Sequence, residues 1–359
     1  MEEKQSRIFY LDFIRVIAIL LVVFIHVSAI DTVQNIGSHT WATIKLLNYF
    51  AHISVPLFFM ISGALLLNSK RTLSLSYTWK KRIPHILIPF LVWSLASPII
   101  GGIHAKDLNW SIVWDSFRLV FGHPTQITYW FMYPLIGIYI LSPIIKALVD
   151  NTDKKMLNYI LIFWFITNSV LPTMFVLLPK QYRHLIEVYP AANFFLIGGY
   201  VGYFILGYYL TKIDLNRFNN WILFIVGILF VLIGCYTEYK NPKLLDIYNA
   251  SYVTEMFIPL MSVPFFMLLQ KWGNRIDSDG IKNVFARLSP LVFGVYLIHN
   301  LIILYIEPFM LASVTGLIGT FSRYIVVLAI SIISIWVLSY IPIINYLFTG
   351  VTRYTKKTK

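Results

Sequence analysis

The feature that most constrains this chain is a series of apolar runs, each about 20 residues long, that recur along nearly its whole length. A run of this length crosses a bilayer as an α-helix, because a helix rises about 1.5 Å per residue and the hydrocarbon core is about 30 Å thick. Hydrophobic residues make up 58% of the sequence and charged residues only 13%, which is atypical of a soluble globular domain. The sequence therefore predicts an all-α, polytopic transmembrane bundle.

The apolar runs predict about ten membrane-spanning helices. Their expected bounds are 8–29, 43–67, 83–103, 128–149, 156–179, 193–212, 220–238, 253–270, 289–313 and 320–348. The longest connections, near 104–127, 239–252 and 271–288, are too short for an additional domain, so we expect one transmembrane domain over residues 1–359 and no attached soluble domain. Lys and Arg concentrate on the side that carries both termini, and the positive-inside rule predicts that both are cytoplasmic.

The formal net charge of +13 does not indicate a nucleic-acid partner, because the basic residues lie between apolar runs and not on one soluble face. We interpret them as topology signals and as charge at the surface of a lipid bilayer. The single cysteine, Cys235, excludes an intramolecular disulfide. No spacing of His and carboxylate residues resembles a metal ligand set, so no metal site is predicted.

Two ionisable residues, Arg15 and His26, interrupt the first apolar run, "DFIRVIAILLVVFIH". On a helix this spacing places them within about 20° of one face and about 16 Å apart along the axis. Ionisable groups in a membrane span are costly unless they face a partner or a wet cavity, so one interpretation is a ligand path along this face. The alternative is that Arg15 pairs with Asp12 and reaches towards the inner surface, while His26 lies in the outer headgroup layer.

Two further segments carry candidates for binding an anionic ligand. In "SVPLFFMISGALLL", Ser62 supplies a hydroxyl and Gly63 permits close approach of a ligand or of a neighbouring helix. The segment "WKKRIPHILIPF" places Lys80, Lys81 and Arg82 at the start of the third span, where cations can hold phosphates. Positive-inside charge accounts for the two lysines, so Arg82 is the candidate for phosphate binding.

Four further residues are weaker candidates for contact with a ligand. His299, in "YLIHN", is expected near mid-membrane, either as a core histidine bonded to a hydroxyl or as part of a cavity. His52, in "FAHISVP", is expected in the outer half of the second span, close to His26. Trp130 and Tyr129 open the fourth span, where they form part of an aromatic belt or stack on a sugar.

Taken in order, these motifs resemble the integral membrane acyltransferase-3 family, typified by bacterial carbohydrate O-acetyltransferases. The most specific mark is the arginine and histidine separated by ten residues in "LDFIRVIAILLVVFIH". Supporting matches are "VPLFFMISGALLL", "KRIPHILIPF", "YWFMYPLIGIYILSP", "FILGYYL" and "FGVYLIHN". The resemblance implies transfer of an acyl group, usually acetyl from cytoplasmic acetyl-CoA, to a hydroxyl of a glycan or glycolipid at the outer face of the cell envelope.

The resemblance also implies roles for the pair in the first helix: Arg15 contacts the CoA and His26 acts at the reaction centre. Arg82, Ser62 and Gly63 are then further candidates on the acyl-CoA side. A histidine ordinarily titrates near neutral pH, so His26 can take the proton of the attacking hydroxyl, or can itself be acylated first. The sequence leaves open the acceptor, the acyl chain, the oligomeric state and any separate partner chain.

Two other function classes compete with an acyltransferase. In a transporter or flippase for a lipid-linked sugar, Arg15, His26 and His299 would line a substrate path. Such proteins often contain two related halves with broken helices, and the sequence shows no such symmetry. A membrane module that senses a ligand and regulates a partner would bind its ligand without turnover.

Overall fold

The computed structural model describes residues 7–34, 36–179, 181, 199–240, 256–310 and 316–350. It is 84% helical, and its described residues contain no strand, which confirms the all-α class. The chain divides into two compact units. Unit 1 holds Met1–Leu21, Tyr49–Lys70 and Ile144–Ser289, and unit 2 holds Val22–Asn48, Arg71–Pro143 and Pro290–Lys359.

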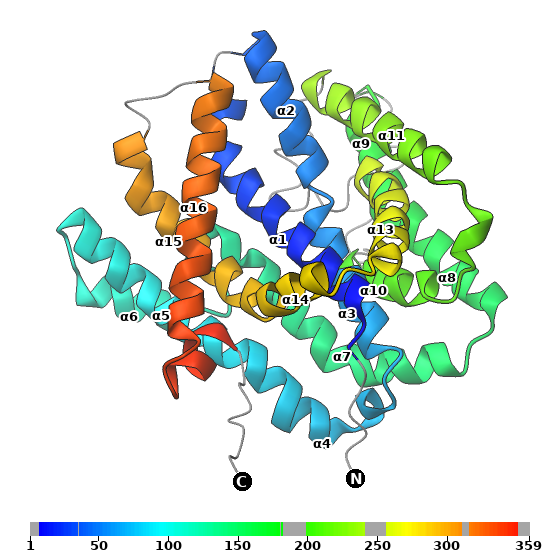
Figure 1. The fold of residues 1–359 in the computed structure, drawn as a ribbon, viewed down its shortest axis with the longest axis horizontal. Coiled ribbons are helices and arrows are strands. Elements are labelled where there is room, and N and C mark those ends of the chain that lie inside the picture. The colour runs from blue at the N-terminus through cyan, green and yellow to red at the C-terminus, as the bar shows by residue number, and fades with distance from the viewer. Residues whose placement is uncertain are drawn as a thin grey trace. The chain divides into compact units, whose positions relative to one another are not determined.

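Figure 1 labels the α-helices along the chain. They are α1 (Phe9–Ser28), α2 (His39–Ala51), α3 (Ser54–Leu66), α4 (Leu75–Tyr77), α5 (Ile83–Ala105), α6 (Trp110–Arg118), α7 (Met132–Asp150), α8 (Lys154–Phe165), α9 (Leu171–Leu177), α10 (Gly199–Leu210), α11 (Asn220–Lys240), α13 (Phe257–Arg275), α14 (Asp279–Leu288), α15 (Val292–Met310) and α16 (Gly316–Leu338).

Eight helical segments within the described residues are long and apolar enough to cross a membrane. They are Phe9–Ser28, His39–Leu66, Leu75–Ala105, Ile127–Asp150, Lys154–Phe175, Asn220–Lys240, Asp279–Ile306 and Gly316–Leu338. The two other expected spans correspond to α10 and α13, and the expected starts of both, at 193–198 and 253–255, lie outside the described residues. The chain is therefore a multi-pass membrane protein, whereas the cytoplasmic position of its termini stays a prediction.

Proline residues explain several irregularities in the spans. The second span is broken between α2 and α3 at His52 and Ile53, four residues before Pro56, because a proline ring clashes with the carbonyl group of the fourth residue before it. Short π-helical turns at Thr78–Arg82 and Ile166–Val170 end just before Pro84 and Pro172. Each wider turn accommodates the hydrogen bond that the proline cannot make.

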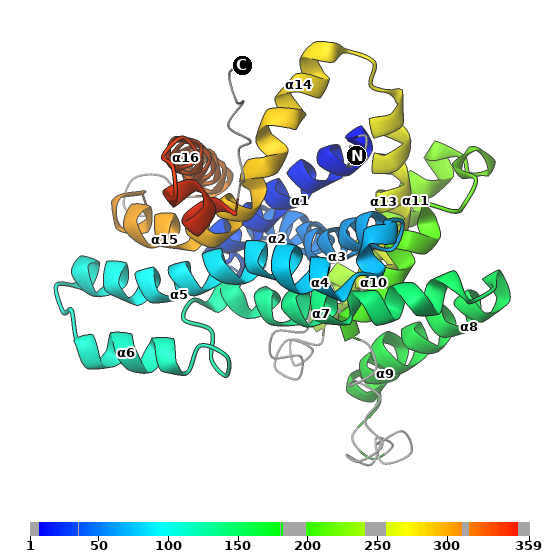
Figure 2. The same ribbon diagram turned by 90° about the horizontal axis from the view of Figure 1, so that it is seen from below.

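The structure corrects one expected boundary and shows a helix in each of two expected connections. The last span ends at Leu338 and not at 348, because Pro342 prevents the helix from continuing. The expected connection 104–127 contains α6, which Figure 2 shows alongside α5, and the connection 271–288 contains α14. Both helices are short and amphipathic, so a search for long apolar runs passes over them.

Helix α16 shows how the spans of unit 2 distribute polar and apolar side chains. Its buried face carries Thr320, Arg323 and Ser331, whereas Ile325 and Ile333 are exposed on the opposite face. This is the reverse of a helix in a soluble protein, because lipid solvates apolar side chains and polar groups must find partners inside the bundle.

Glycine residues bring α3 and α10 of unit 1 into close contact. A β-carbon added to Gly63 would lie 1.7 Å from the carbonyl oxygen of Phe204, and one added to Gly207 would lie 1.9 Å from the carbonyl oxygen of Met60. Each helix thus has a glycine where the backbone of the other approaches, which is a common way of packing helices in membranes. Of the two interpretations of Gly63, close helix packing accounts for its position.

Replacing Gly207 by alanine tests this contact. We expect Gly207→Ala to lower the free energy of unfolding by about 2 kcal/mol, because the added methyl group forces the two backbones apart. Gly137→Ala is the matched control, since no atom lies within 4 Å of the added carbon and alanine favours a helix. Thermal unfolding in detergent compares the two, and equal stability of both variants would contradict the close-packing interpretation.

Candidate active site

The side chain of Arg15 lies in a polar cluster in unit 1. Its Nη1 donates hydrogen bonds to Ser289 Oγ at 2.9 Å and to Asp12 Oδ1 at 3.3 Å, and Ser289 Oγ donates to the same carboxylate oxygen at 2.6 Å. Asp12 and Ser289 are both buried, whereas the Arg15 side chain retains 29% exposure. The pairing with Asp12 that the sequence suggested is present, and Ser289 joins it from a segment 274 residues away.

A second arginine, Arg7, shares the carboxylate of this cluster. Arg7 forms an ion pair with the other oxygen of Asp12, and its Nη2 donates to the carbonyl oxygen of Ala286 at 2.8 Å. One carboxylate is therefore shared by two guanidinium groups, Arg7 and Arg15. Guanidinium groups are good partners for anionic groups such as phosphates, so the cluster suits an anionic ligand.

His26 and His299 lie together in unit 2. His26 is on the last turn of α1, and the centroid of its ring is 5.2 Å from that of His299 on α15. His26 is half-buried, whereas His299 is completely buried. Of the two histidines, His26 is therefore the one with an accessible surface.

The hydrogen bond of His299 fixes which of its ring nitrogens carries a proton in the neutral form. Its Nδ1 lies 2.6 Å from the carbonyl oxygen of Tyr296. A carbonyl oxygen only accepts, so Nδ1 must donate, and Nε2 of the neutral ring then carries a lone pair. No described residue forms a hydrogen bond with this Nε2. Within the described residues, His299 is therefore bonded to a backbone carbonyl and not, as one of the two interpretations from the sequence expected, to a hydroxyl.

Two tyrosines fix α15 against the 3₁₀ turn Ile127–Phe131 that leads into α7. The hydroxyl of Tyr129 donates to the carbonyl oxygen of Leu297 at 2.8 Å, and the hydroxyl of Tyr296 donates to the carbonyl oxygen of Thr128. Tyr129 is completely buried, and its expected contact with a sugar stays a prediction. Its hydroxyl helps to hold the helix that carries His299.

A pocket of about 190 Å³ opens beside His26. Its two polar lining residues are His26 and Arg323, and its apolar wall includes Val27, Ile303 and Val327. Pockets that enclose a drug-sized molecule usually have about 300 Å³ or more, so this one fits a small group and not a whole sugar.

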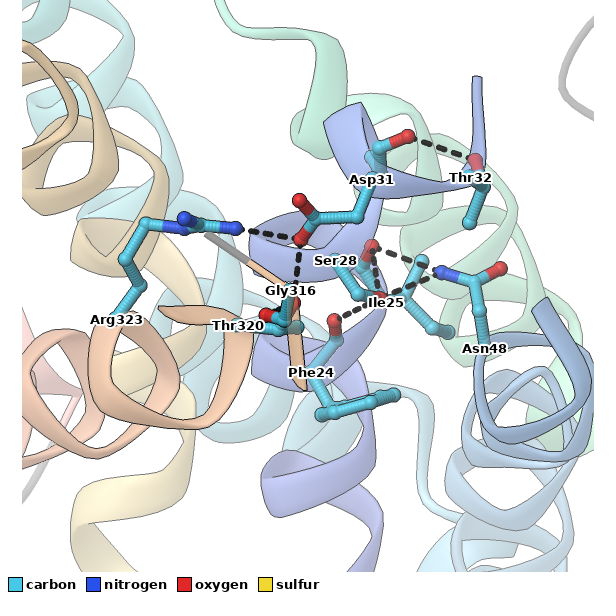
Figure 3. A network of polar contacts seen from close by, with 10 residues as sticks. Phe24, Ile25, Ser28, Asp31, Thr32, Asn48, Gly316, Thr320 and Arg323 are labelled. Atoms are coloured by element: carbon cyan, nitrogen blue, oxygen red, sulfur yellow. Dashed lines mark hydrogen bonds and ion pairs between the residues drawn. The ribbon is translucent and has the colours of Figure 1, made fainter. Parts of the chain in front are cut away.

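A buried ion pair holds Arg323 at this pocket (Figure 3). Its Nη2 donates to Asp31 Oδ2 at 2.5 Å, and Thr320 Oγ1 lies 2.7 Å from the same oxygen. Asp31 belongs to the 3₁₀ turn Ile30–Thr32 that follows α1, and Arg323 belongs to α16. Sequence reasoning counted Arg323 only as a topology charge, because nothing near it in the sequence indicates that its partner lies 292 residues away.

Arg82, Ser62 and Trp130 are not among the residues that line this pocket. Arg82 donates to Thr72 Oγ1 at 2.7 Å and lies 5.1 Å from the ring centre of Tyr77. Ser62 is half-buried on α3. Trp130 is half-buried beside the ring of Phe131.

His52 lies in the turn between α2 and α3, 6.2 Å from the ring of Tyr49, in unit 1, whereas His26 belongs to unit 2. Its expected proximity to His26 stays a prediction. Within the described residues, no group of three or more His, Cys, Asp or Glu side chains could hold a metal ion.

The family comparison settles the broad activity. A family model described as an acyltransferase domain matches residues 8–340, which is nearly the whole chain. This chain belongs to the acyltransferase-3 family. It is accordingly a membrane acyltransferase. No curated protein and no solved structure shows significant similarity to it.

The acyltransferase fold unites two of the sequence motifs. Tyr129, the first residue of "YWFMYPLIGIYILSP", donates to the backbone of Leu297 in "FGVYLIHN". Tyr296 in the second motif donates to the backbone of Thr128, which directly precedes the first. The first of these motifs thereby positions the second, which contains His299. The order of the motifs was visible in the sequence, and their contact is a property of the fold.

The buried pair of this acyltransferase gives a stability prediction. Asp31→Ala leaves Arg323 buried without its carboxylate, and we expect the free energy of unfolding to fall by about 3–5 kcal/mol. Asp115→Ala is the control, because it breaks the exposed pair with Arg118, which contributes about 1 kcal/mol or less. Thermal unfolding of both variants measures the difference, and a loss no larger in Asp31→Ala than in Asp115→Ala would contradict the importance of the buried pair.

Proposed function

We propose that this protein is an acyl-CoA-dependent O-acyltransferase that moves an acyl group, most simply acetyl, to a hydroxyl of a glycan or glycolipid. The donor would enter from the cytoplasm and the acceptor would lie at the outer face of the cell membrane, with both termini cytoplasmic. The observation that carries the proposal is that His26 lines a small pocket, next to His299, in a membrane acyltransferase.

The proposed donor side rests on the charges around Arg15. Coenzyme A is anionic, and Arg7 and Arg15 share the single carboxylate of Asp12, so their cluster attracts phosphate groups. Arg15 is also on the same continuous helix as His26, about 16 Å away along the axis, a distance that an extended pantetheine arm covers. Arg82 and Ser62 are separate candidates for the donor, and Gly63 contributes by setting the spacing of α3 and α10.

In the proposed chemistry, His26 acts as a general base. It accepts the proton of the acceptor hydroxyl as the hydroxyl oxygen bonds to the thioester carbonyl carbon, and it returns this proton to the departing thiolate when the carbon–sulfur bond breaks. The second route, in which a nitrogen of His26 first takes the acyl group and then passes it to the hydroxyl, uses the same residue as a nucleophile. His299, whose Nε2 carries a lone pair in the neutral form, can accept a hydrogen bond from His26 or from the acceptor.

Replacing His26 tests its role at the reaction centre. We expect His26→Ala to reduce transfer of radiolabelled acetyl from acetyl-CoA to the glycolipid and cell-wall fractions by at least about 100-fold, because general-base catalysis contributes about 10²–10⁴-fold. Binding of acetyl-CoA should stay near the parental value. His123→Ala is the control, since His123 is exposed in a loop. Undiminished transfer in His26→Ala would refute the proposal.

Replacing Arg15 tests the donor side without an acceptor. Saturable binding of acetyl-CoA must raise the thermal stability of the parent protein by mass action. We expect Arg15→Ala to weaken this binding by about 10-fold or more, as the loss of a charge-assisted hydrogen bond does. Asp12 keeps its pair with Arg7 in this variant, so the cluster is not left with an unpaired carboxylate.

Arg118→Ala is the control for a general effect of charge, because Arg118 is exposed and pairs with Asp115 on its own helix. Arg82→Ala, measured in the same titration, tests whether Arg82 also contributes to acetyl-CoA binding. An unchanged affinity in Arg15→Ala would remove Arg15 from the donor site. No stabilisation of the parent by acetyl-CoA or by succinyl-CoA would favour transport over acyl transfer.

A further inference from the structure

The pocket beside His26 contains a guanidinium group to which the chemistry above assigns no role. Arg323 lines this pocket, and only 7% of its side chain is exposed. A buried guanidinium within a membrane span is costly, and such groups usually mark a functional site or are fully paired within the protein. The question is therefore whether the contacts of Arg323 account for its presence.

The contacts of Arg323 account for only part of its hydrogen-bonding capacity. Asp31 binds Nη2, but Nε is buried and no described residue accepts a hydrogen bond from it. A guanidinium carries five N–H donors and no acceptor, so an oxygen or another acceptor is needed to complete its bonding. Buried donors are almost always paired in folded proteins, which makes an orphaned donor at a pocket an indication of a ligand.

The ion pair indicates what kind of ligand suits this site. Asp31 neutralises Arg323, so the pocket has no excess cation with which to attract a phosphate or carboxylate. A neutral oxygen that gains negative charge during the reaction is the better match, because a donor held in place by its partner stabilises developing charge without having to reorganise. The small volume and apolar wall of the pocket fit a short acyl group.

We propose that Arg323 donates a hydrogen bond to the carbonyl oxygen of the acyl group, and that Asp31 holds it in position to do so. This inference rests on the proposed acyl transfer at His26. When the acceptor oxygen bonds to the carbonyl carbon, the carbonyl electron pair moves to the oxygen and His26 takes the hydroxyl proton. Arg323 stabilises the resulting oxyanion until the carbon–oxygen double bond forms again and the thiolate leaves with the proton from His26.

The decisive variant is Arg323→Lys, which keeps a cation beside Asp31 but removes Nε and the planar fork of donors. We expect it to lower kcat by about 100-fold, as the loss of one oxyanion donor does, while the KM for acetyl-CoA and the thermal stabilisation by acetyl-CoA stay within about threefold of the parent. Thr320→Val is the matched control, because it removes another contact of Asp31 and leaves the guanidinium intact.

A spectroscopic probe reports on the carbonyl oxygen without turnover. The probe is the ketone analogue of acetyl-CoA in which a methylene group replaces the sulfur, with a ¹³C-labelled carbonyl. A hydrogen bond to the carbonyl lowers its stretching frequency, so we expect a lower frequency in the parent and in Thr320→Val than in Arg323→Lys. The same frequency in all three proteins would overturn the inference.

The two levels of the proposal fail in different ways. If the analogue binds and Arg323 lowers its carbonyl frequency, but no acetyl transfer to glycolipid or cell-wall fractions occurs, the proposed function fails and the oxygen site stands. If transfer occurs in the parent and both Arg323→Lys and Thr320→Val lose it equally, with no difference in carbonyl frequency, the ion pair is only a structural link between α16 and the turn after α1.

Discussion

Lipid offers no hydrogen bonds, so each polar group that this sequence places in a membrane span needs a partner inside the protein. Arg15 is bonded to Asp12 and Ser289, and Arg323 is bonded to Asp31. Asp12 lies one turn from Arg15, whereas Ser289 and Asp31 come from distant parts of the chain. These contacts keep the polar face of each helix against the protein. The placement of the candidate site follows from this requirement.

The chemistry of the site follows from how rigidly its groups are held. The hydrogen bonds of Tyr129 and Tyr296 to facing backbone carbonyls fix α15 and therefore His299. The pair of Asp31 and Arg323 fixes the turn after α1 against α16, immediately beyond His26. In the proposed reaction, groups held in this way would need little rearrangement as charge develops, which is the basis of electrostatic catalysis.

Much of the helical framework was predictable, because a membrane span is encoded by a local run of apolar residues. The prediction was wrong where another local signal competed with hydropathy. Pro342 ends the last span at Leu338 although apolar residues continue beyond it. Helices α6 and α14 were missed because a short amphipathic helix has no long apolar run. The burial of Tyr129 was not predictable, since an aromatic residue near the end of a span has the same sequence signature whether it faces lipid or the core.

The sequence by itself determined the class of fold, the approximate spans and the register of Arg15 and His26, because all three depend on helix periodicity within one short segment. Only the tertiary structure decided which distant groups meet. Ser289 reaches Arg15 across 274 residues and Asp31 reaches Arg323 across 292, and nothing local predicts either contact. The physical reason is that such pairs form only where two helix faces pack together, and the choice of those faces is made by the whole bundle.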